Sequence, residues 1–156
     1  IHGDMKPENI LVSKDHIPKL TDFGNAAMSE YTLQFSRSNT TPSMSMRWTA
    51  PEIVSEETKA TQAGDVYALG MIIFEVMTGI LPYDGVREPS IMRRILAGKV
   101  PSRPETHIPA GVDQADRLWS LITSCWAFDP KERPEAWEVK NALGGITPEG
   151  LLSNAS

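Results

Sequence analysis

The chain has 156 residues, of which 40% are hydrophobic and 22% are charged, a composition typical of one globular domain or a large part of one. Its net charge of -5 gives no support for nucleic acid or an acidic membrane surface as a partner. The single cysteine, Cys125, excludes a disulfide framework within the chain, so we expect a reducing, cytoplasmic compartment. No apolar run reaches the roughly 18–20 residues that a membrane span needs, so no membrane segment is expected.

The first third of the chain predicts short strands joined by turns. Residues 10–12 and 18–21 are apolar or β-prone and are separated by Ser13-Lys14-Asp15-His16, which indicates a small hairpin. Residues 35–45 are rich in Ser, Thr, Asn and Pro and predict a loop.

Helices are expected from Thr61 onward. Thr61 is a candidate N-cap, residues 65–78 are apolar on nearly all sides, and Gly79 is a stop signal, which together predict a central buried helix. Shorter helices are predicted over 89–97 and 134–143. Between them, apolar residues recur at helical spacing and indicate one buried face: Ala115, Leu118, Trp119, Ile122, Cys125 and Trp126.

Two motifs at the ends of the predicted hairpin bring oxygen ligands and one cation toward a single point. Residues 2–9 contain Asp4, a lysine two residues later and an asparagine five residues later. Asp22-Phe23-Gly24 follows the second strand. Such a set suits a nucleoside triphosphate with magnesium, because magnesium prefers oxygen ligands and shares them with phosphate. Phosphoryl transfer itself needs positioning and charge neutralisation more than covalent help.

These motifs and three later ones resemble the protein kinase family in order and spacing. Residues 2–9 resemble its catalytic loop, residues 22–24 its metal-binding loop, and Ala50-Pro51-Glu52 the end of its activation segment. Residues 65–70 are similar to the start of its central helix. The resemblance runs from residue 1 to about residue 144, and its last part includes the motifs Cys125-Trp126, Asp129-Pro130 and Arg133-Pro134.

The resemblance implies the C-terminal lobe of a kinase domain. The expected fold is mainly α, a helical bundle with a small β-hairpin that carries the catalytic and Asp-Phe-Gly loops, within a whole domain that is α+β. Residues 1–145 would form this partial domain, and residues 146–156 a polar tail that is frayed from residue 147. The N-lobe is absent from the chain and is expected as a partner from the same parent chain. Without it, we expect exposed apolar surface and no activity.

The family's functional residues fall on five positions. Asp4 and Lys6 would be catalytic, Asp4 orienting the substrate hydroxyl and Lys6 supporting the γ-phosphate of ATP. Asn9 and Asp22 would hold the Mg²⁺ ions. Leu11 would lie under the adenine ring.

The resemblance also implies structural roles. Glu52 would pair with Arg133, and Asp65 would bond the backbone of the catalytic loop. His2 is interpreted as a core histidine. Ser45 stands where the family has a residue that bridges the catalytic Asp and Lys.

The remaining aromatic and sulfur-containing residues are interpreted as packing. Trp48, Trp119, Trp126 and Trp137 are expected to pack rather than to bind a cofactor, and Cys125 is expected to be a small buried hydrophobe.

One position departs from the family pattern. The usual arginine of the catalytic loop receives a phosphate from the activation segment, and here it is Gly3, which cannot pair with phosphate. We therefore hypothesise that activity does not depend on such phosphorylation, although five hydroxyl residues remain candidate sites: Ser36, Ser38, Thr40, Thr41 and Ser43.

The acceptor residue is suggested by a mixture of features. Lys6-Pro7-Glu8-Asn9 resembles Ser/Thr kinases, whereas residues 47–52 and Cys125-Trp126 resemble tyrosine kinases and the tyrosine-kinase-like Ser/Thr group. The mixture favours that last group, with Ser or Thr of protein substrates as acceptor and Tyr as the alternative. A pseudokinase or scaffold is the competing hypothesis, and a small-molecule or lipid kinase a weaker one. Retention of all four polar site residues favours an active kinase.

Overall fold

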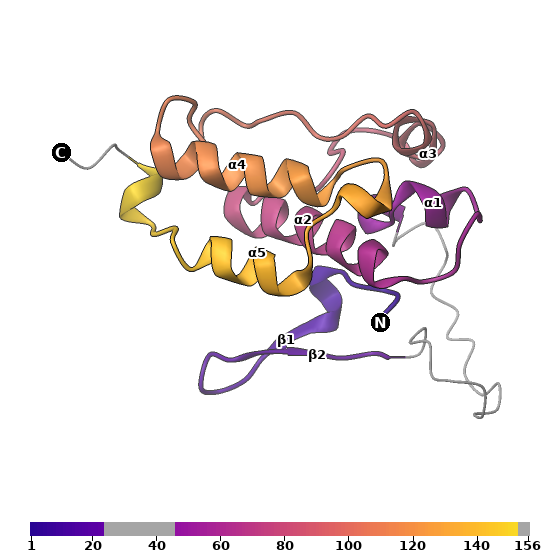
Figure 1. Cartoon of the computed structure of the whole chain (residues 1–156), viewed down its shortest axis with the longest axis horizontal. Coiled ribbons are helices and arrows are strands. Elements are labelled where there is room, and N and C mark those ends of the chain that lie inside the picture. Colours follow the sequence, from indigo (N-terminus) through magenta and orange to yellow (C-terminus); the bar gives the residue numbers. More distant parts are fainter. Residues whose placement is uncertain (24–45, 153–156) are drawn as a thin grey trace.

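The computed structural model describes residues 1–23 and 46–152, which form a two-stranded hairpin and five α-helices (Figure 1). The prediction of a mainly α fold with one small hairpin is therefore confirmed. The elements in chain order are β1 Ile10–Val12, β2 Pro18–Leu20, α1 Pro51–Val54, α2 Gln62–Thr78, α3 Glu88–Leu96, α4 Asp113–Cys125 and α5 Ala136–Leu143.

The hairpin is antiparallel, with Leu11 opposite Lys19 at its centre. Its connection is closed by two hydrogen bonds between Ser13 and Ile17, and His16 adopts a left-handed φ of 59°. Strands this short are not stable by themselves in water. The end of the hairpin is bonded to the preceding 3-10 helix, Pro7–Asn9, because the Thr21 amide donates to the Asn9 carbonyl at 2.8 Å.

The central helix, α2, forms as its end signals predict. The Thr61 Oγ1 accepts a hydrogen bond from the Gly64 amide at 2.9 Å, and Gly79 ends the helix with a φ of 67°. In Figure 1, α4 lies above α2, and α5 and the hairpin lie below it. Burial on most of its sides explains why the sequence of α2 is apolar almost all round.

The contact between α2 and α4 requires a glycine. A Cβ atom at Gly70 would lie 2.6 Å from the Cβ of Cys125 and 3.0 Å from the Trp126 Nε1. Trp126 also packs edge-on against Trp119, with ring centroids 5.8 Å apart, and contacts Phe74. The close approach lets these rings fill the space between the two helices.

The shorter helices begin and end within two residues of the predicted positions. In α3, Ile91 and Ile95 are buried and anchor the helix to the core. The last helix, α5, begins at Ala136 rather than at Pro134, because Glu135 and Glu138 form a capping box there.

Two sequence-based expectations are wrong. Trp137 is 61% exposed and does not pack into the core. The tail is not frayed over 147–152, because the Thr147 amide donates to the Gln114 Oε1 at 2.6 Å and Leu151 is buried against α4. The boundary at residue 145 stays a prediction. Across the described ranges, no helix combines the length and the apolar character that crossing a bilayer requires.

Candidate active site

His2 attaches the catalytic loop, residues 2–9, to the end of the hairpin. Its Nε2 donates to the Thr21 carbonyl at 2.7 Å, and its Nδ1 accepts from the Asp4 amide at 3.2 Å. A carbonyl can only accept and an amide N–H can only donate, so these partners select the neutral imidazole with its proton on Nε2. The side chain is buried, and its interpretation as a core histidine is confirmed.

Asp65, in the first turn of α2, holds the start of the same loop. Its two carboxylate oxygens accept hydrogen bonds from the His2 amide at 2.6 Å and from the Gly3 amide at 2.9 Å. This confirms the structural role expected for Asp65. Gly3 has a φ of 84°, in the left-handed region that favours glycine, so the local backbone suits the residue that departs from the family pattern.

Asp4, Lys6 and Asn9 form one polar cluster. The Lys6 Nζ lies 3.2 Å from the Asp4 Oδ2, and the Asn9 Nδ2 donates to the Asp4 carbonyl oxygen at 2.7 Å and toward its carboxylate at 3.4 Å. Lys6 and Asn9 are buried, at 7% and 6% exposure, whereas the Asp4 side chain remains 16% accessible. The cluster therefore presents a carboxylate with a cation beside it at a surface that a substrate can reach.

The hairpin carries Asp22 next to this cluster. The Thr21 amide and hydroxyl both donate to the Asn9 carbonyl, at 2.8 and 3.2 Å, so the residue before Asp22 is bonded directly to Asn9. On the other side, the Phe23 ring lies 4.8 Å from the His2 ring. Asp22 itself has a φ of 56°, a conformation that costs a non-glycine residue about 1–2 kcal/mol and that often occurs at functional sites.

The donor set fits magnesium only if phosphate completes it. Because the Asn9 amide nitrogen donates to Asp4, its oxygen is the atom that remains for a metal. Over residues 1–23 and 46–152, no group of three His, Cys, Asp or Glu side chains could hold a metal ion alone. Asn9 and Asp22 oxygens together with phosphate oxygens match the way Mg²⁺ is usually bound with nucleotides.

The hairpin itself exposes several apolar side chains to solvent. Leu11 is 57% exposed, and Val12, Ile17 and Leu20 are exposed beside it. The position of Leu11 is compatible with contact to a flat ring, but its role under adenine stays a prediction.

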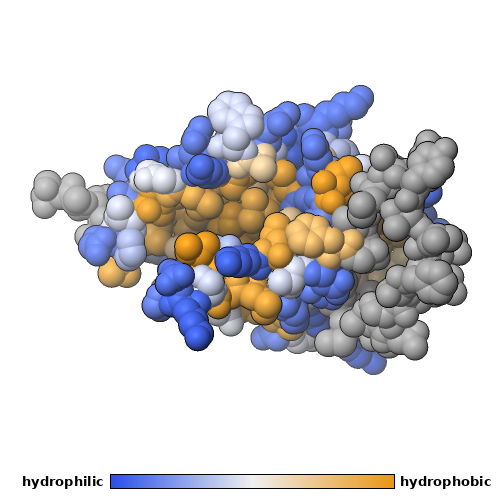
Figure 2. All heavy atoms as spheres, turned by 90° about the horizontal axis from the view of Figure 1, so that it is seen from below, coloured by the Kyte–Doolittle hydropathy of each residue, from blue (hydrophilic) through white to orange (hydrophobic). Residues whose placement is uncertain are grey.

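A groove is lined by the catalytic loop, the end of the hairpin, α2 and the start of α5. Its volume is about 820 Å³, and its lining includes Met5, Phe23, Leu69 and Trp137. Figure 2, which views the hairpin side, shows an apolar hollow between more polar rims. The expectation of exposed apolar surface is confirmed for this face.

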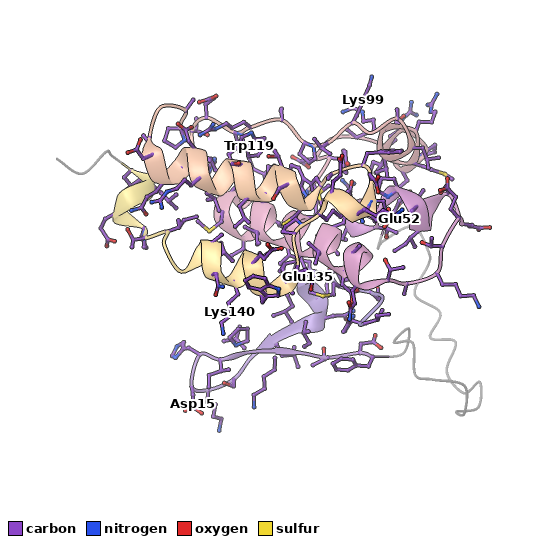
Figure 3. The ribbon with its side chains drawn as sticks, in the orientation of Figure 1. Asp15, Glu52, Lys99, Trp119, Glu135 and Lys140 are labelled. Carbon is purple, nitrogen blue, oxygen red and sulfur yellow. The ribbon has the colours of Figure 1, made fainter. Side chains whose placement is uncertain are left out.

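Residues 47–52, at the end of the activation segment, are bonded to the helical core. Glu52 and Arg133 form the expected pair, with oxygen–nitrogen distances of 2.7 and 2.8 Å (Glu52 is labelled in Figure 3). Two contacts were not predicted: Arg47 donates to the carbonyls of Pro82 and Tyr83, at 2.6 and 2.9 Å. Their only sequence signal was the position of Arg47 shortly before Ala50-Pro51-Glu52.

A third unpredicted contact is made by Trp48, the next residue in the chain. The Trp48 Nε1 donates to the Glu75 Oε2 at 3.1 Å. Burial raises the pKa of Glu75, and the hydrogen bond from Trp48 opposes this rise. Trp48 therefore packs as expected and also supplies a partner for a carboxylate on α2.

Several predicted residues lie outside the described residues. These are Gly24, Ser45 and the candidate phosphorylation sites Ser36, Ser38, Thr40, Thr41 and Ser43.

Comparison with known proteins agrees with the arrangement of these motifs. The model of the protein kinase domain family matches residues 1–143. A probable serine/threonine-protein kinase of Dictyostelium discoideum is 35% identical over 144 residues, which cover 92% of this chain and 10% of that protein. A second one from the same organism, drkD, is 30% identical over 96% of the chain and 11% of its own length.

Tyrosine kinases are similar to the chain as well. Protein-tyrosine kinase 6 of Mus musculus is 30% identical over 148 residues, which cover 94% of this chain and 30% of that protein. The chain thus spans between 10% and 30% of the length of these three relatives. Since the family model covers nearly all of the chain and the motifs converge in space, the chain belongs to the protein kinase domain family.

Proposed function

We propose that the protein containing this chain transfers the γ-phosphate of ATP, with Mg²⁺, to Ser or Thr hydroxyls of protein substrates. The cluster of Asp4, Lys6 and Asn9 carries this proposal. A partly accessible carboxylate with a lysine ammonium 3.2 Å away can orient a hydroxyl and neutralise phosphate charge at the same place.

In this mechanism, bound Mg–ATP supplies the phosphoryl group and the leaving group. Asp4 accepts a hydrogen bond from the substrate hydroxyl and takes its proton as the new bond forms. Lys6 offsets the negative charge of the transferred group, and Asn9 and Asp22 provide oxygen ligands for magnesium. His2 and Asp65 take no part in the chemistry but hold the loop in position, which is the larger part of catalysis in phosphoryl transfer.

Ser or Thr as the acceptor rests on the catalytic loop. Lys6-Pro7-Glu8-Asn9 is typical of Ser/Thr kinases, and two of the similar proteins carry that activity in their names. Tyr stays the alternative because a tyrosine kinase is similarly related.

We also propose that the parent chain supplies an N-lobe and that the 156 residues do not turn over alone. The exposed apolar hairpin around Leu11 and the groove beside Leu69 and Trp137 support this, because apolar surfaces of this kind are usually covered. ATP binding would then also need the surface of the N-lobe that faces Leu11.

The test is transfer of labelled phosphate from ATP by the complete parent chain to a pool of Ser, Thr and Tyr peptides. Asp22→Ala is expected to abolish transfer, and the labelled amino acid identifies the acceptor. Asp15→Ala is the matched control, because Asp15 lies exposed at the far end of the hairpin (Figure 3) and should leave transfer unchanged. No transfer by the unmodified chain would favour a pseudokinase or scaffold instead.

A further inference from the structure

The segment around α3 has the opposite charge to the rest of the chain. Residues 87–100 contain four basic residues and one acidic residue, a net charge of +3. Because the whole chain carries -5, the other residues carry -8. A local reversal of this size makes the α3 region the place to which an anionic partner is attracted.

The electrostatics of the helix explain only part of this cluster. Arg93 and Arg94 lie in the last turn of α3, where cations interact favourably with the helix dipole. Arg87, however, occupies the N-cap position without a side-chain capping bond, and a cation there is unfavourable to the dipole. Lys99 lies beyond the helix. The stability of the helix therefore explains the presence of neither Arg87 nor Lys99.

Apolar side chains are exposed on this segment and beside it. Met92 and Leu96, one turn apart on one flank of α3, are 39% and 38% exposed. The Phe128 ring, 57% exposed, packs over Gly98, where an added Cβ would meet it at 3.3 Å. Arg93 is adjacent to Met92 and three residues before Leu96, so a cation borders the apolar flank.

The backbone that presents these side chains is fixed. Ile91 and Ile95 are each 1% exposed and anchor the inner face of α3. After the helix, the Lys99 amide donates to the Arg94 carbonyl at 2.8 Å, and the Lys99 carbonyl accepts from the Tyr83 hydroxyl at 3.1 Å. A partner that binds here would therefore meet a rigid surface and would not have to order a loop.

This region is remote from the hairpin. In Figure 1, α3 lies at the end of the molecule that is farthest from the hairpin turn. Figure 3 shows Lys99 at the top of the view, pointing away from the ribbon, and Lys140 on the opposite side near the hairpin. Occupation of the α3 region would leave the catalytic loop and the groove uncovered.

We propose that Met92, Leu96 and Phe128, with Arg93 and Lys99 at their border, form a docking surface for an acidic protein segment that carries apolar anchor residues. Met92 and Leu96 lie four positions apart, about one helical turn, which fits a pair of apolar anchors, and the basic border fits carboxylates. An anionic membrane is less suited to it, because the most apolar face of α3 is already used in the core by Ile91 and Ile95.

The experiment measures binding of a fluorescein-labelled, helix-forming peptide of Glu and Ala with Leu and Phe four positions apart, by fluorescence anisotropy with the chain of 156 residues. We expect saturable binding that weakens as salt rises. Arg93→Glu with Lys99→Glu should weaken it by about ten-fold or more, and Leu96→Ser with Phe128→Ser should weaken it similarly. Circular dichroism checks that each variant is folded.

The matched control is Lys14→Glu with Lys140→Glu, which changes the net charge equally at exposed positions on the hairpin and α5. It should leave binding within about two-fold of the unmodified chain. Absence of binding, equal weakening by both charge reversals, or unchanged binding in the Leu96 and Phe128 variant would overturn the proposal. So would binding to phosphatidylserine vesicles without binding to the acidic peptide.

Discussion

Arg133 and Glu52 form a bidentate ion pair that joins positions 81 residues apart in the sequence. The guanidinium also donates to the carbonyls of Ala63 and Ala127 and lies 5.0 Å from the centre of the Tyr67 ring. Each charge is therefore buried with its partners in place. This pair connects the end of the activation segment with α2 and with the turn before α5.

Removal of one member of this pair should destabilise the fold strongly. Arg133→Met leaves the Glu52 carboxylate buried without its cation, and we expect a loss of about 3–5 kcal/mol in the free energy of unfolding. Urea denaturation followed by circular dichroism measures the loss. Asp116→Asn is the control, because its pair with Arg103 is exposed and should cost no more than about 1 kcal/mol. Equal losses in the two variants would contradict this interpretation.

The glycine at the α2–α4 contact predicts an effect opposite to helix propensity. Alanine favours a helix by about 1 kcal/mol over glycine, but at Gly70 its Cβ would lie 2.6 Å from that of Cys125. We expect Gly70→Ala to destabilise the chain by about 1–3 kcal/mol through overpacking. Gly145→Ala, whose Cβ would meet only ordinary contacts, should change the stability by less than about 1 kcal/mol. A thermal melt of both variants decides the sign, and a more stable Gly70→Ala chain would show that α4 can move away.

The buried thiol predicts a loss of stability at alkaline pH. Burial raises the pKa of Cys125 to about 11 from an ordinary value of 9.0, so the unfolded chain loses this proton first as pH rises. The stability is fully present below pH 9 and decreases between about pH 9 and 11. At pH 10 the loss from this group is about 1 kcal/mol relative to pH 7.5.

Cys125→Ala isolates this contribution, because Tyr67 also has a raised pKa owing to burial and remains in the variant. Urea denaturation at pH 7.5 and pH 10 should show a smaller decrease in the variant than in the unmodified chain. The same pH dependence in both chains would mean that the thiol ionises without cost to the fold.

Gly3 predicts how the activity responds to phosphorylation. A glycine with a φ of 84° offers no side chain to receive a phosphate, so alanine at Ser36, Ser38, Thr40, Thr41 and Ser43 together should leave the parent chain's phosphate transfer within about two-fold. The measurement is the initial rate with labelled ATP, with a thermal melt as the folding control. Loss of activity in a folded variant would show that another cation receives a phosphate from this segment.

Local signals in the sequence predicted the ends of the central helix, and the family resemblance predicted two long-range contacts. Thr61 and Gly79 mark the ends of α2 because a capping hydroxyl and a left-handed glycine act locally. The pairing of Glu52 with Arg133 and the bonds of Asp65 were predicted only through the family resemblance, since no local rule connects residues so far apart.

The missed features depend on tertiary contacts. The exposure of Trp137 depends on the groove beside it, and the ordered end of the chain on the Gln114 side chain of α4. Arg47 donates to two backbone carbonyls in the segment before α3. Any arginine can bond a carbonyl, so no feature of the sequence singles out this one. The roles of Asp4, Lys6, Asn9 and Asp22 in catalysis stay predictions that the geometry supports.

The hydrogen bonds of Asp65 have a consequence for the cooperativity of the molecule. Asp65 belongs to the helix with the most buried residues, and it accepts from the first two amides of the catalytic loop. We expect a loop attached in this way to open together with the start of α2. The amides of His2 and Gly3 should therefore exchange with solvent at rates set by unfolding of the core, although they lie in a loop at the surface of a groove. Exchange at such rates would place the catalytic loop in the same folding unit as α2.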